Sequence, residues 1–288
     1  MPSSDAGRWF GSMEQDVRYS IIVVCLNAGQ RLCETVDSIL AQRYANFEVV
    51  IKDGGSSDGS LNALGARCQN ERIRVSVQGD NGIYDAMNQA VRLAQGDYLL
   101  FLNAGDSFYE DTVLDRITDV IVRRRQAGKK TDIIYGNLYH KALDTVVYSA
   151  PVINDFTCYR NVPCHQTCFY HRALFEARGY RPAYNVRADY EHFLWCYYEQ
   201  KAVITYAPVV VAAYEGGGYS ETKENRKRSK RQHRAITVHY MGRGRAYWYR
   251  LVMLLTLAPL RSAVAQDKRL SVVYNRVKAA VYRVKGKR

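Results

Sequence analysis

The chain has 288 residues, of which 47% are hydrophobic and 24% charged, and these proportions argue against a disordered, collagen-like or coiled-coil protein. Its length is enough for one large or two small domains with a substantial core. The formal net charge of +13 is unevenly placed, because residues 221–288 hold 19 Lys and Arg against 3 Asp and Glu, whereas residues 1–220 are mildly acidic. The basic C-terminal segment therefore needs its own explanation.

Strand-like and helix-like segments alternate over the first hundred residues. Short apolar runs predict strands over 19–26, 47–51, 73–77 and 98–102, and helical spacing predicts helices over 31–42, 57–69 and 83–94. Gly96 stands where the glycine that follows a helix is expected. The alternation predicts an α/β fold with a Rossmann-like, mostly parallel sheet flanked by helices.

The segment over residues 141–220 is less regular. We expect strands over 146–148, 166–170, 203–206 and 209–214, and a helix over 188–200. The chain then divides into a flexible tail over 1–18, one domain over 19–220 and a basic helical extension over 221–288.

Cysteine usage and hydropathy indicate the compartment. The seven cysteines are an odd number scattered through the chain, which favours reduced thiols in the cytoplasm over a disulfide framework. Residues 1–18 lack the apolar core of a signal peptide. The longest apolar stretch, Leu251–Leu260, has about half of the ~20 residues that a membrane-spanning helix needs.

Small and acidic residues follow three of the predicted strands. Asn27-Ala28-Gly29 follows the first, Asp53–Gly59 the second and Asn103–Asp106 the fourth. Parallel sheets bind ligands at the carboxyl ends of their strands. The glycine-rich fingerprints of dinucleotide and P-loop sites are absent from the sequence. We therefore expect a nucleotide held by side-chain carboxylates, with a cation at its diphosphate.

These motifs, taken in order, resemble those of the family 2 glycosyltransferases, which have the GT-A fold. The resemblance covers about residues 19–220, and its motifs are Ser20–Asn27, Asp53–Gly59, Asp80–Asn88, Gly96–Asp106 and Ala188–Glu191. The most similar subgroup builds bacterial surface polysaccharides. The resemblance implies an inverting transfer of a sugar from a nucleotide-sugar, preferably UDP-linked, to a saccharide carried on a lipid.

The resemblance also implies a donor-binding set. Asp53 would accept a hydrogen bond from the uracil imide N–H, because a carboxylate can only accept. The other members of the implied set are Leu26, Asn27, Asp80, Asp85 and Asn88. Two plainer interpretations remain open: Asp53 as a turn residue, and Asp85 as an acid stabilised by the positive end of its helix.

A divalent cation, Mn²⁺ or Mg²⁺, is implied by the position of Asn103-Ala104-Gly105-Asp106, where the family carries its D-x-D motif. Only Asp106 keeps a carboxylate, and Asn103 offers a weaker amide oxygen. One carboxylate with diphosphate oxygens can suffice for Mg²⁺. We therefore expect weak metal affinity in the absence of the donor.

The resemblance implies that Asp189 is the catalytic base, since inverting transfer needs a carboxylate close to the acceptor hydroxyl. Glu191 is the alternative base. Two residues along a helix differ in direction by about 200°, so the two carboxylates cannot face one site. Asp189 could instead cap the helix that follows it. The acceptor side is expected to include His165 and Gln166, which resemble a His-Gln pair of the subgroup, together with Glu191 and Gly217, the latter in a loop that closes over the substrate.

The C-terminal extension combines positive charge with apolar and aromatic residues. Asn225–Arg234 is a basic run, Ala246–Leu260 is rich in aromatic and apolar residues, and apolar residues recur at helical spacing from Leu270 to Val284. This combination is typical of helices that lie in an anionic membrane surface. We expect a peripheral protein on the inner face of the cell membrane. The alternatives are a helix packed on the body, and a nucleic-acid-binding protein that uses the basic tail.

Overall fold

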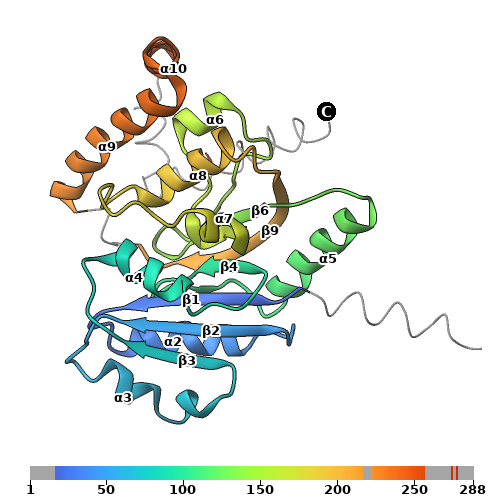
Figure 1. Cartoon of the computed structure of the whole chain (residues 1–288), viewed down its shortest axis with the longest axis vertical. Helices are drawn as coiled ribbons and strands as arrows, with labels where there is room; N and C mark the ends of the chain where they lie inside the picture. The colour runs from blue at the N-terminus through green and yellow to red at the C-terminus, as the bar shows by residue number, and fades with distance from the viewer. Residues whose placement is uncertain (1–16, 217–221, 257–273, 275–276, 278–288) are drawn as a thin grey trace, which may run out of the picture.

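The computed structural model describes residues 17–216 and 222–256, together with Tyr274 and Val277. Within these residues a nine-stranded sheet forms the centre, with helices on both faces (Figure 1). The strands lie in the order β3-β2-β1-β4-β8-β6-β9-β5, and β7 pairs with β6. The predicted α/β fold is confirmed.

The first half of the sheet is the predicted parallel part. The strands β1 (Tyr19–Cys25), β2 (Phe47–Asp53), β3 (Ile73–Val77) and β4 (Tyr98–Phe101) are mutually parallel. They are connected by α2 (Gln30–Leu40), by α3 (Ser60–Leu64) with a 3-10 turn over Gly65–Gln69, and by α4 (Ile83–Val91). Each of these elements lies within a few residues of its predicted position, because its apolar residues recur at the period of the element.

The second half of the sheet contains elements that the sequence analysis did not predict. They are β5 (Ser107–Phe108), α5 (Val113–Gln126) and β6 (Ile133–His140), all missing from the prediction. The shorter elements are β7 (Thr145–Val147), α6 (Asp155–Arg160), a 3-10 turn over His165–Thr167, β8 (Cys168–His171) and α7 (Arg172–Ala177). The strand β8 runs antiparallel to both of its neighbours, β4 and β6.

One prediction in this half was wrong in detail. The two strands expected over 203–206 and 209–214 form a single strand, β9 (Ile204–Tyr214), parallel to β6. Pro208, which has no N–H to give to a ladder, lies where the register of the two strands shifts. The sequence pattern breaks at this proline, whereas the backbone continues through it.

Both faces of the sheet are covered by core. Along β1, Ile21 and Val23 pack with α2 and α5 on one face, whereas Ile22 and Val24 join α4 and α8 (Ala188–Tyr198) on the other. A strand buried on both faces reads as a continuous apolar run, which is why this strand was recognisable in the sequence.

Gly96 is required by a close approach and does not cap a helix. The helix α4 already ends at Val91, and a β-carbon on Gly96 would lie 2.6 Å from the backbone nitrogen of Ser20. Because that neighbour is backbone, it cannot move aside cheaply. The sequence-based interpretation of Gly96 as a helix terminator was therefore wrong.

Replacing Gly96 is expected to weaken the start of β1. Gly96→Ala should lower the free energy of unfolding by about 1–3 kcal/mol, measured by urea denaturation, because overpacking forces a backbone shift. Gly244→Ala is the matched control, since nothing lies within 4 Å of the added β-carbon there. If Gly96→Ala and Gly244→Ala unfolded at the same urea concentration, this explanation of Gly96 would be contradicted.

The basic C-terminal helices are α9 (Lys223–Met241) and α10 (Arg243–Leu255). They lie beside α6 and α8, at the top of Figure 1. None of the helices in the described part of the chain is long and apolar enough to cross a membrane. The apolar repeat from Leu270 to Val284 falls, except for Tyr274 and Val277, outside the described residues.

Candidate active site

The carboxyl ends of β1, β2 and β4 meet at one edge of the sheet, and the candidate site lies there. This edge is completed by residues at the start of α4, in the 3-10 turn before β8, and in the first turn of α8. Segments far apart in sequence therefore supply the site, as expected for an open α/β sheet.

Asp189, in the first turn of α8, is held by two side chains from other elements. The Tyr84 hydroxyl, from α4, donates to Oδ1 of Asp189 at 2.7 Å. The His165 Nδ1 lies 3.3 Å from Oδ2. The carboxylate nevertheless keeps 27% of its side-chain surface exposed. It is thus fixed in orientation and still open to a reacting group.

The protonation state of Asp189 is decided by opposing effects. Burial on its own raises the pKa of the carboxyl group, but hydrogen bonds from His165 and Tyr84, together with the charge of His165, lower it further than burial raises it. The net pKa of Asp189 therefore lies below its ordinary value. At neutral pH Asp189 is ionised, which is the state that accepts a proton.

His165 also links Asp189 to the end of β4. Its Nε2 lies 3.2 Å from the amide nitrogen of Asn103. Because an amide nitrogen can only donate, a neutral His165 accepts here through Nε2 and donates from Nδ1–H toward Asp189. The Oδ1 atom of Asn103 is buried without a hydrogen-bond partner among the described residues.

Asp106 lies in the same group and is bonded by Gln166, the residue that follows His165. Its Oδ2 accepts from the Gln166 amide at 2.9 Å, and its Oδ1 accepts from the backbone N–H of Glu215 at 3.2 Å. Burial raises the pKa of Asp106 above its ordinary value, although these hydrogen bonds oppose the shift. We call this group the Asp189 cluster; it contains Tyr84, Asn103, Asp106, His165, Gln166 and Asp189.

The cluster offers a partial set of ligands for a divalent cation. Within the described ranges, no three His, Cys, Asp or Glu side chains gather closely enough to hold a metal ion by themselves. Asp106 supplies one carboxylate, and the unpartnered Oδ1 of Asn103 supplies a second oxygen of the kind that Mg²⁺ and Mn²⁺ accept. The residues therefore fit a weak site that needs further oxygens from a bound phosphate.

Asp53, at the end of β2, is engaged in its own turn. Its side chain is fully buried, and its oxygens accept from the N–H groups of Gly55 and Ser56, from the Ser56 hydroxyl and from the Cys25 thiol. Burial raises the pKa of Asp53, but these hydrogen bonds outweigh it and the net pKa is lowered. In this conformation Asp53 stabilises the turn and faces no open space, which matches the interpretation of Asp53 as a turn residue.

Leu26, Asn27 and Asp80 lie close to this turn. The Leu26 side chain is 60% exposed, and a β-carbon on Gly54 would contact both Leu26 and Asp80. The Asn27 side chain accepts from the N–H of Ser57. These three residues form the rim of a surface at the ends of β1 and β2.

Lys52 is a buried partner of Asp80 that the sequence reasoning missed. Its ammonium group lies 2.8 Å from Asp80 Oδ2 and donates to the carbonyl of Gln78, and its side chain has no exposed surface. A lysine next to the carboxyl end of an apolar strand was the available signal. Lys52 holds Asp80 in place, because a buried ammonium needs a paired charge.

Asp85 and Asn88 make structural contacts within and beside α4. Asp85 accepts from the backbone N–H of Asn81, as an acid in a first helical turn commonly does. Both polar ends of the Asn88 amide bond the backbone of Tyr180. The structure thus places neither side chain in the Asp189 cluster.

Glu191 is separated from Asp189, as the helical geometry required. It is 1% exposed, its two oxygens pair with the two terminal nitrogens of Arg178, and Oε1 also accepts from the Tyr240 hydroxyl of α9. An ion pair enclosed in this way has no access to a substrate, so the alternative role of Glu191 as base or acceptor contact finds no support. Gly217 lies outside the described residues.

Two cations near Gly105 also escaped the sequence reasoning. The Lys141 ammonium donates to the Gly105 carbonyl and pairs with Glu215. The Arg31 side chain lies where a β-carbon on Gly105 would contact it. Neither residue belongs to a recognisable motif, because each reaches the site only through the packing of the sheet. By contrast, Tyr84 lies inside the Asp80–Asn88 motif and could have been singled out.

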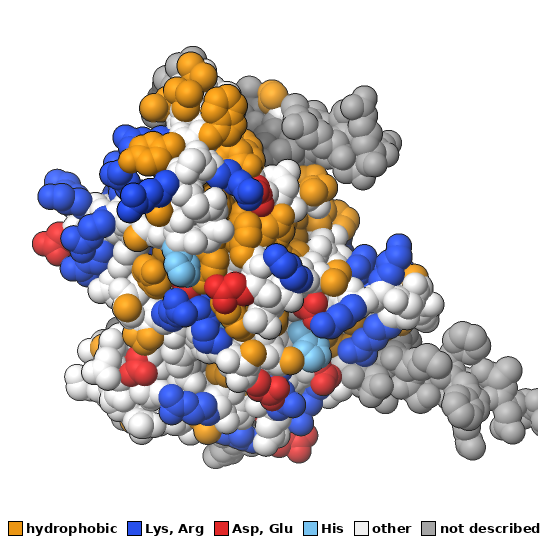
Figure 2. Space-filling view, turned by 45° about the horizontal axis from the view of Figure 1, so that its top comes forward, with side chains coloured by type: hydrophobic (Ala, Val, Ile, Leu, Met, Phe, Trp, Pro, Cys, Tyr) orange, Lys and Arg blue, Asp and Glu red, His pale blue; other side chains and the backbone are white. Residues whose placement is uncertain are grey.

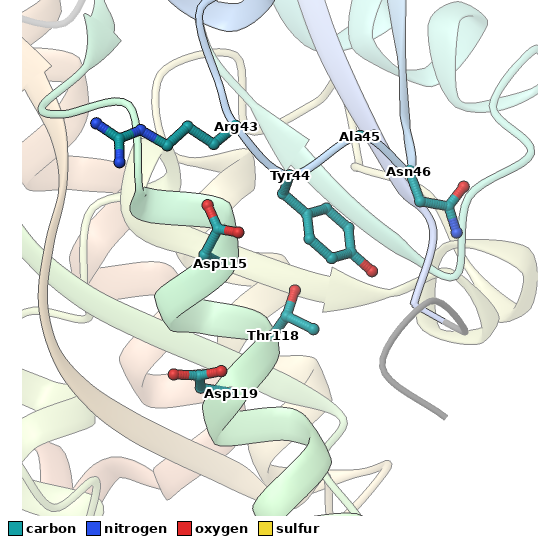
Figure 3. A pocket seen from close by; sticks show the side chains of 7 residues that line it. All are labelled: Arg43, Tyr44, Ala45, Asn46, Asp115, Thr118 and Asp119. Atoms are coloured by element: carbon teal, nitrogen blue, oxygen red, sulfur yellow. The ribbon is translucent and has the colours of Figure 1, made fainter. Parts of the chain in front are cut away.

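A separate hollow lies away from these strand ends. It is bounded by Arg43–Asn46, just before β2, and by one side of α5, with Tyr44 and Thr118 facing each other (Figure 3). It lies at the amino end of β2, opposite to the Asp189 cluster, and contains none of the predicted site residues. We therefore place the functional site at the carboxyl ends.

Known proteins resemble this chain in sequence and in fold. A relative from Mycobacterium tuberculosis, a PGL/p-HBAD biosynthesis glycosyltransferase, is 37% identical over 217 residues, which cover 74% of this chain and 83% of the relative. Glycosyltransferase GlyG of Streptococcus pneumoniae is 31% identical over 42% of this chain and 39% of the relative.

Among solved structures, S. aureus TarS 1-349 in complex with UDP-GlcNAc superposes with a TM-score of 0.61 at 18% identity, over 78% of this chain and 67% of that one. Mannosyltransferase PcManGT from Pyrobaculum calidifontis, in complex with GDP-Man and Mn²⁺, gives 0.58 at 16% identity, over 94% and 87%. These structures share the GT-A fold with this chain.

The family profile settles the classification. The family described as Glycosyl transferase family 2 matches residues 20–177, which include β1–β4, Asp106 and His165. The chain therefore belongs to glycosyl transferase family 2.

Proposed function

We propose that this protein transfers a sugar from a UDP-linked donor to a hydroxyl group of a lipid-linked saccharide, with inversion, and that Asp189 is the catalytic base. The observation that carries the proposal is the Asp189 carboxylate itself. It is ionised, partly exposed and oriented by Tyr84 and His165 at the carboxyl edge of the sheet.

The reaction follows from these contacts. The acceptor oxygen attacks the anomeric carbon while Asp189 takes the hydroxyl proton, and the bond from that carbon to the diphosphate breaks, with its electron pair leaving on UDP. His165 and Tyr84 keep the carboxylate oriented during the transfer. A divalent cation, when bound by Asp106 and Asn103, supplies neutralisation of the negative charge on the leaving diphosphate.

Two observations support a UDP-linked donor: the nucleotide-sugars bound in the similar solved structures, and the exposed residues at the carboxyl ends of β1 and β2. TarS 1-349 was solved with UDP-GlcNAc, and PcManGT with GDP-Man and Mn²⁺. In this chain the exposed Leu26 and the Lys52-held Asp80 border the surface next to Gly54. We place the nucleotide there, with Asn27 beside it, and the sugar toward Asp189. Asp53 would bind the base only after its turn rearranges.

Calorimetric titration with UDP, GDP, CDP and TDP, each with and without Mn²⁺, tests the donor and the cation together. We expect UDP to bind most tightly and Mn²⁺ to tighten its binding at least tenfold, because the diphosphate supplies the missing ligands. Asp106→Asn should remove the Mn²⁺ effect, whereas Asp119→Asn on α5, in the hollow of Figure 3, should keep it. Equal affinity for all four nucleotides would contradict a base-reading pocket.

The lipid-linked acceptor is supported by the position of α9 and α10, whose exposed residues resemble those of membrane-surface helices. Incubation of the protein with radiolabelled UDP-sugars and bacterial lipid extract should move label into the organic phase. Label appearing only on water-soluble saccharides would contradict the lipid-linked acceptor.

A further inference from the structure

Six cations line one exposed side of α9, from its first residue to Arg234. They recur at alternating intervals of three residues and one residue, a spacing that puts side chains on the same face of a helix. All six are exposed, and Glu224 is the sole acid in the helix. We call them the cationic face; they are Lys223, Arg226, Lys227, Lys230, Arg231 and Arg234.

The following helix, α10, presents large apolar side chains to the outside. Their exposed fractions lie between 46% and 72%, and a contiguous group of exposed apolar side chains marks an interaction surface. Their spacing again puts them on one side of the helix, while the opposite side packs on the body through Ala246 and Tyr249. We call them the apolar face; they are Tyr247, Trp248, Leu251, Leu254 and Leu255.

The two faces are continuous. The Arg234 guanidinium lies over the Tyr247 ring, 5.9 Å from its centroid, and donates to the Tyr247 hydroxyl at 2.9 Å. Figure 2 shows the result on the surface: hydrophobic side chains at the upper tip of the molecule adjoin a group of Lys and Arg side chains. A single surface therefore combines exposed apolar and aromatic groups with a dense positive charge.

We propose that the cationic and apolar faces together dock onto a bilayer that contains anionic phospholipid. The chemistry matches both parts of such a surface, since cations meet the charged headgroups and Trp, Tyr and Leu enter the boundary between headgroups and acyl chains. A nucleic acid would use the cationic face alone. A second copy of the chain would bring two cationic faces together at a cost in repulsion.

The docking surface is firmly joined to the segment that carries Asp189. From α9, the Gln232 side chain bonds the Val186 N–H and the Asn185 side chain, and the Ser229 hydroxyl accepts from Arg187. Because residues 185–187 immediately precede α8, a bilayer bound through α9 and α10 holds the candidate active site at a fixed position relative to the lipid. An acceptor anchored in that lipid would then be presented repeatedly to the same site.

Vesicle flotation of the full chain tests the proposal. Vesicles of phosphatidylcholine with about 30% phosphatidylglycerol should bind the protein, and pure phosphatidylcholine should bind it weakly. Arg226→Gln with Lys230→Gln should weaken binding about 25-fold, at about fivefold per cation. The triple variant Trp248→Ser, Leu251→Ser, Leu255→Ser should weaken it at least tenfold. The matched control is Arg123→Gln with Lys129→Gln on and after α5, two exposed cations outside the surface, and it should bind like the original protein.

A second measurement reports contact with lipid directly. In a Trp9→Phe background, where Trp195 and Trp248 are the remaining tryptophans, vesicles made with brominated lipid should quench the fluorescence of Trp248, and this quenching should disappear when Trp248→Phe is added. Trp195 serves as an internal reference, because it is buried. Quenching that persists unchanged in Trp248→Phe would overturn the proposed role of the apolar face.

Three further results would overturn the proposal: equal binding to neutral and anionic vesicles, tighter binding to duplex DNA than to vesicles, or a dimer in sedimentation that the triple variant dissolves. UDP titration of every variant keeps the tests separate. A variant that loses vesicle binding but retains UDP affinity tests the docking proposal alone. Failure of UDP binding in the original protein would contradict the proposed reaction and would not affect the docking proposal.

Discussion

Asp189→Asn is expected to lower kcat by about 10²–10⁴-fold, because an amide cannot take the acceptor proton that the carboxylate removes. The substitution keeps the shape of the side chain and can still accept from Tyr84, so the site should remain assembled. Steady-state transfer assays give kcat, and calorimetry should show unchanged affinity for UDP. Full activity in this variant would remove Asp189 from the role of base.

The pH profile provides an independent check on the same residue. Because the pKa of Asp189 is lowered in the folded protein, Asp189 stays ionised through neutral pH, and the rate should fall only as the pH drops through that lowered value. His165→Phe removes a hydrogen bond that lowers the pKa of Asp189. The acid limb of kcat should therefore move to higher pH in His165→Phe. An unmoved limb would show that another group controls it.

Glu191→Ala is expected to lower the free energy of unfolding by about 3–5 kcal/mol, because it leaves the mostly buried Arg178 without its partner. It also removes the acceptor of the Tyr240 hydroxyl and so loosens α9 from α8. Urea denaturation measures the change, and Glu191→Gln, which keeps an acceptor, should cost less than Glu191→Ala.

Glu199 is the matched control for this substitution, since it follows the same helix and is exposed. Glu199→Ala should change the free energy of unfolding by no more than about 0.5 kcal/mol. A similar loss in both variants would mean that the effect belongs to the helix as a whole and not to the buried ion pair. A stable, active Glu191→Ala protein would contradict the structural assignment of Glu191.

The sequence determined the parallel half of the sheet and the order of its strand-end motifs. β1 and β3 were recognisable within a residue, because apolar periodicity is a local property that chain neighbours alone reveal. It also determined that Asp189 and Glu191 could not serve one site, because their directions on a helix follow from its pitch. Local patterns were insufficient for β6 and for the continuous β9, whose pairing depends on strands remote in the chain.

Only the tertiary structure decided which of these residues meet. Tyr84 and Asp189 are more than a hundred positions apart in the sequence, and Lys52, near the end of β2, pairs with Asp80, which follows β3. Neither contact can therefore be predicted from local spacing. The tertiary structure likewise shows Asp53 accepting hydrogen bonds from its own turn and Glu191 in an ion pair, because burial and the number of partners depend on what the fold brings around each carboxylate. A pattern of acidic residues along a chain shows what chemistry is available; their direction and pKa arise from contacts that exist only after folding.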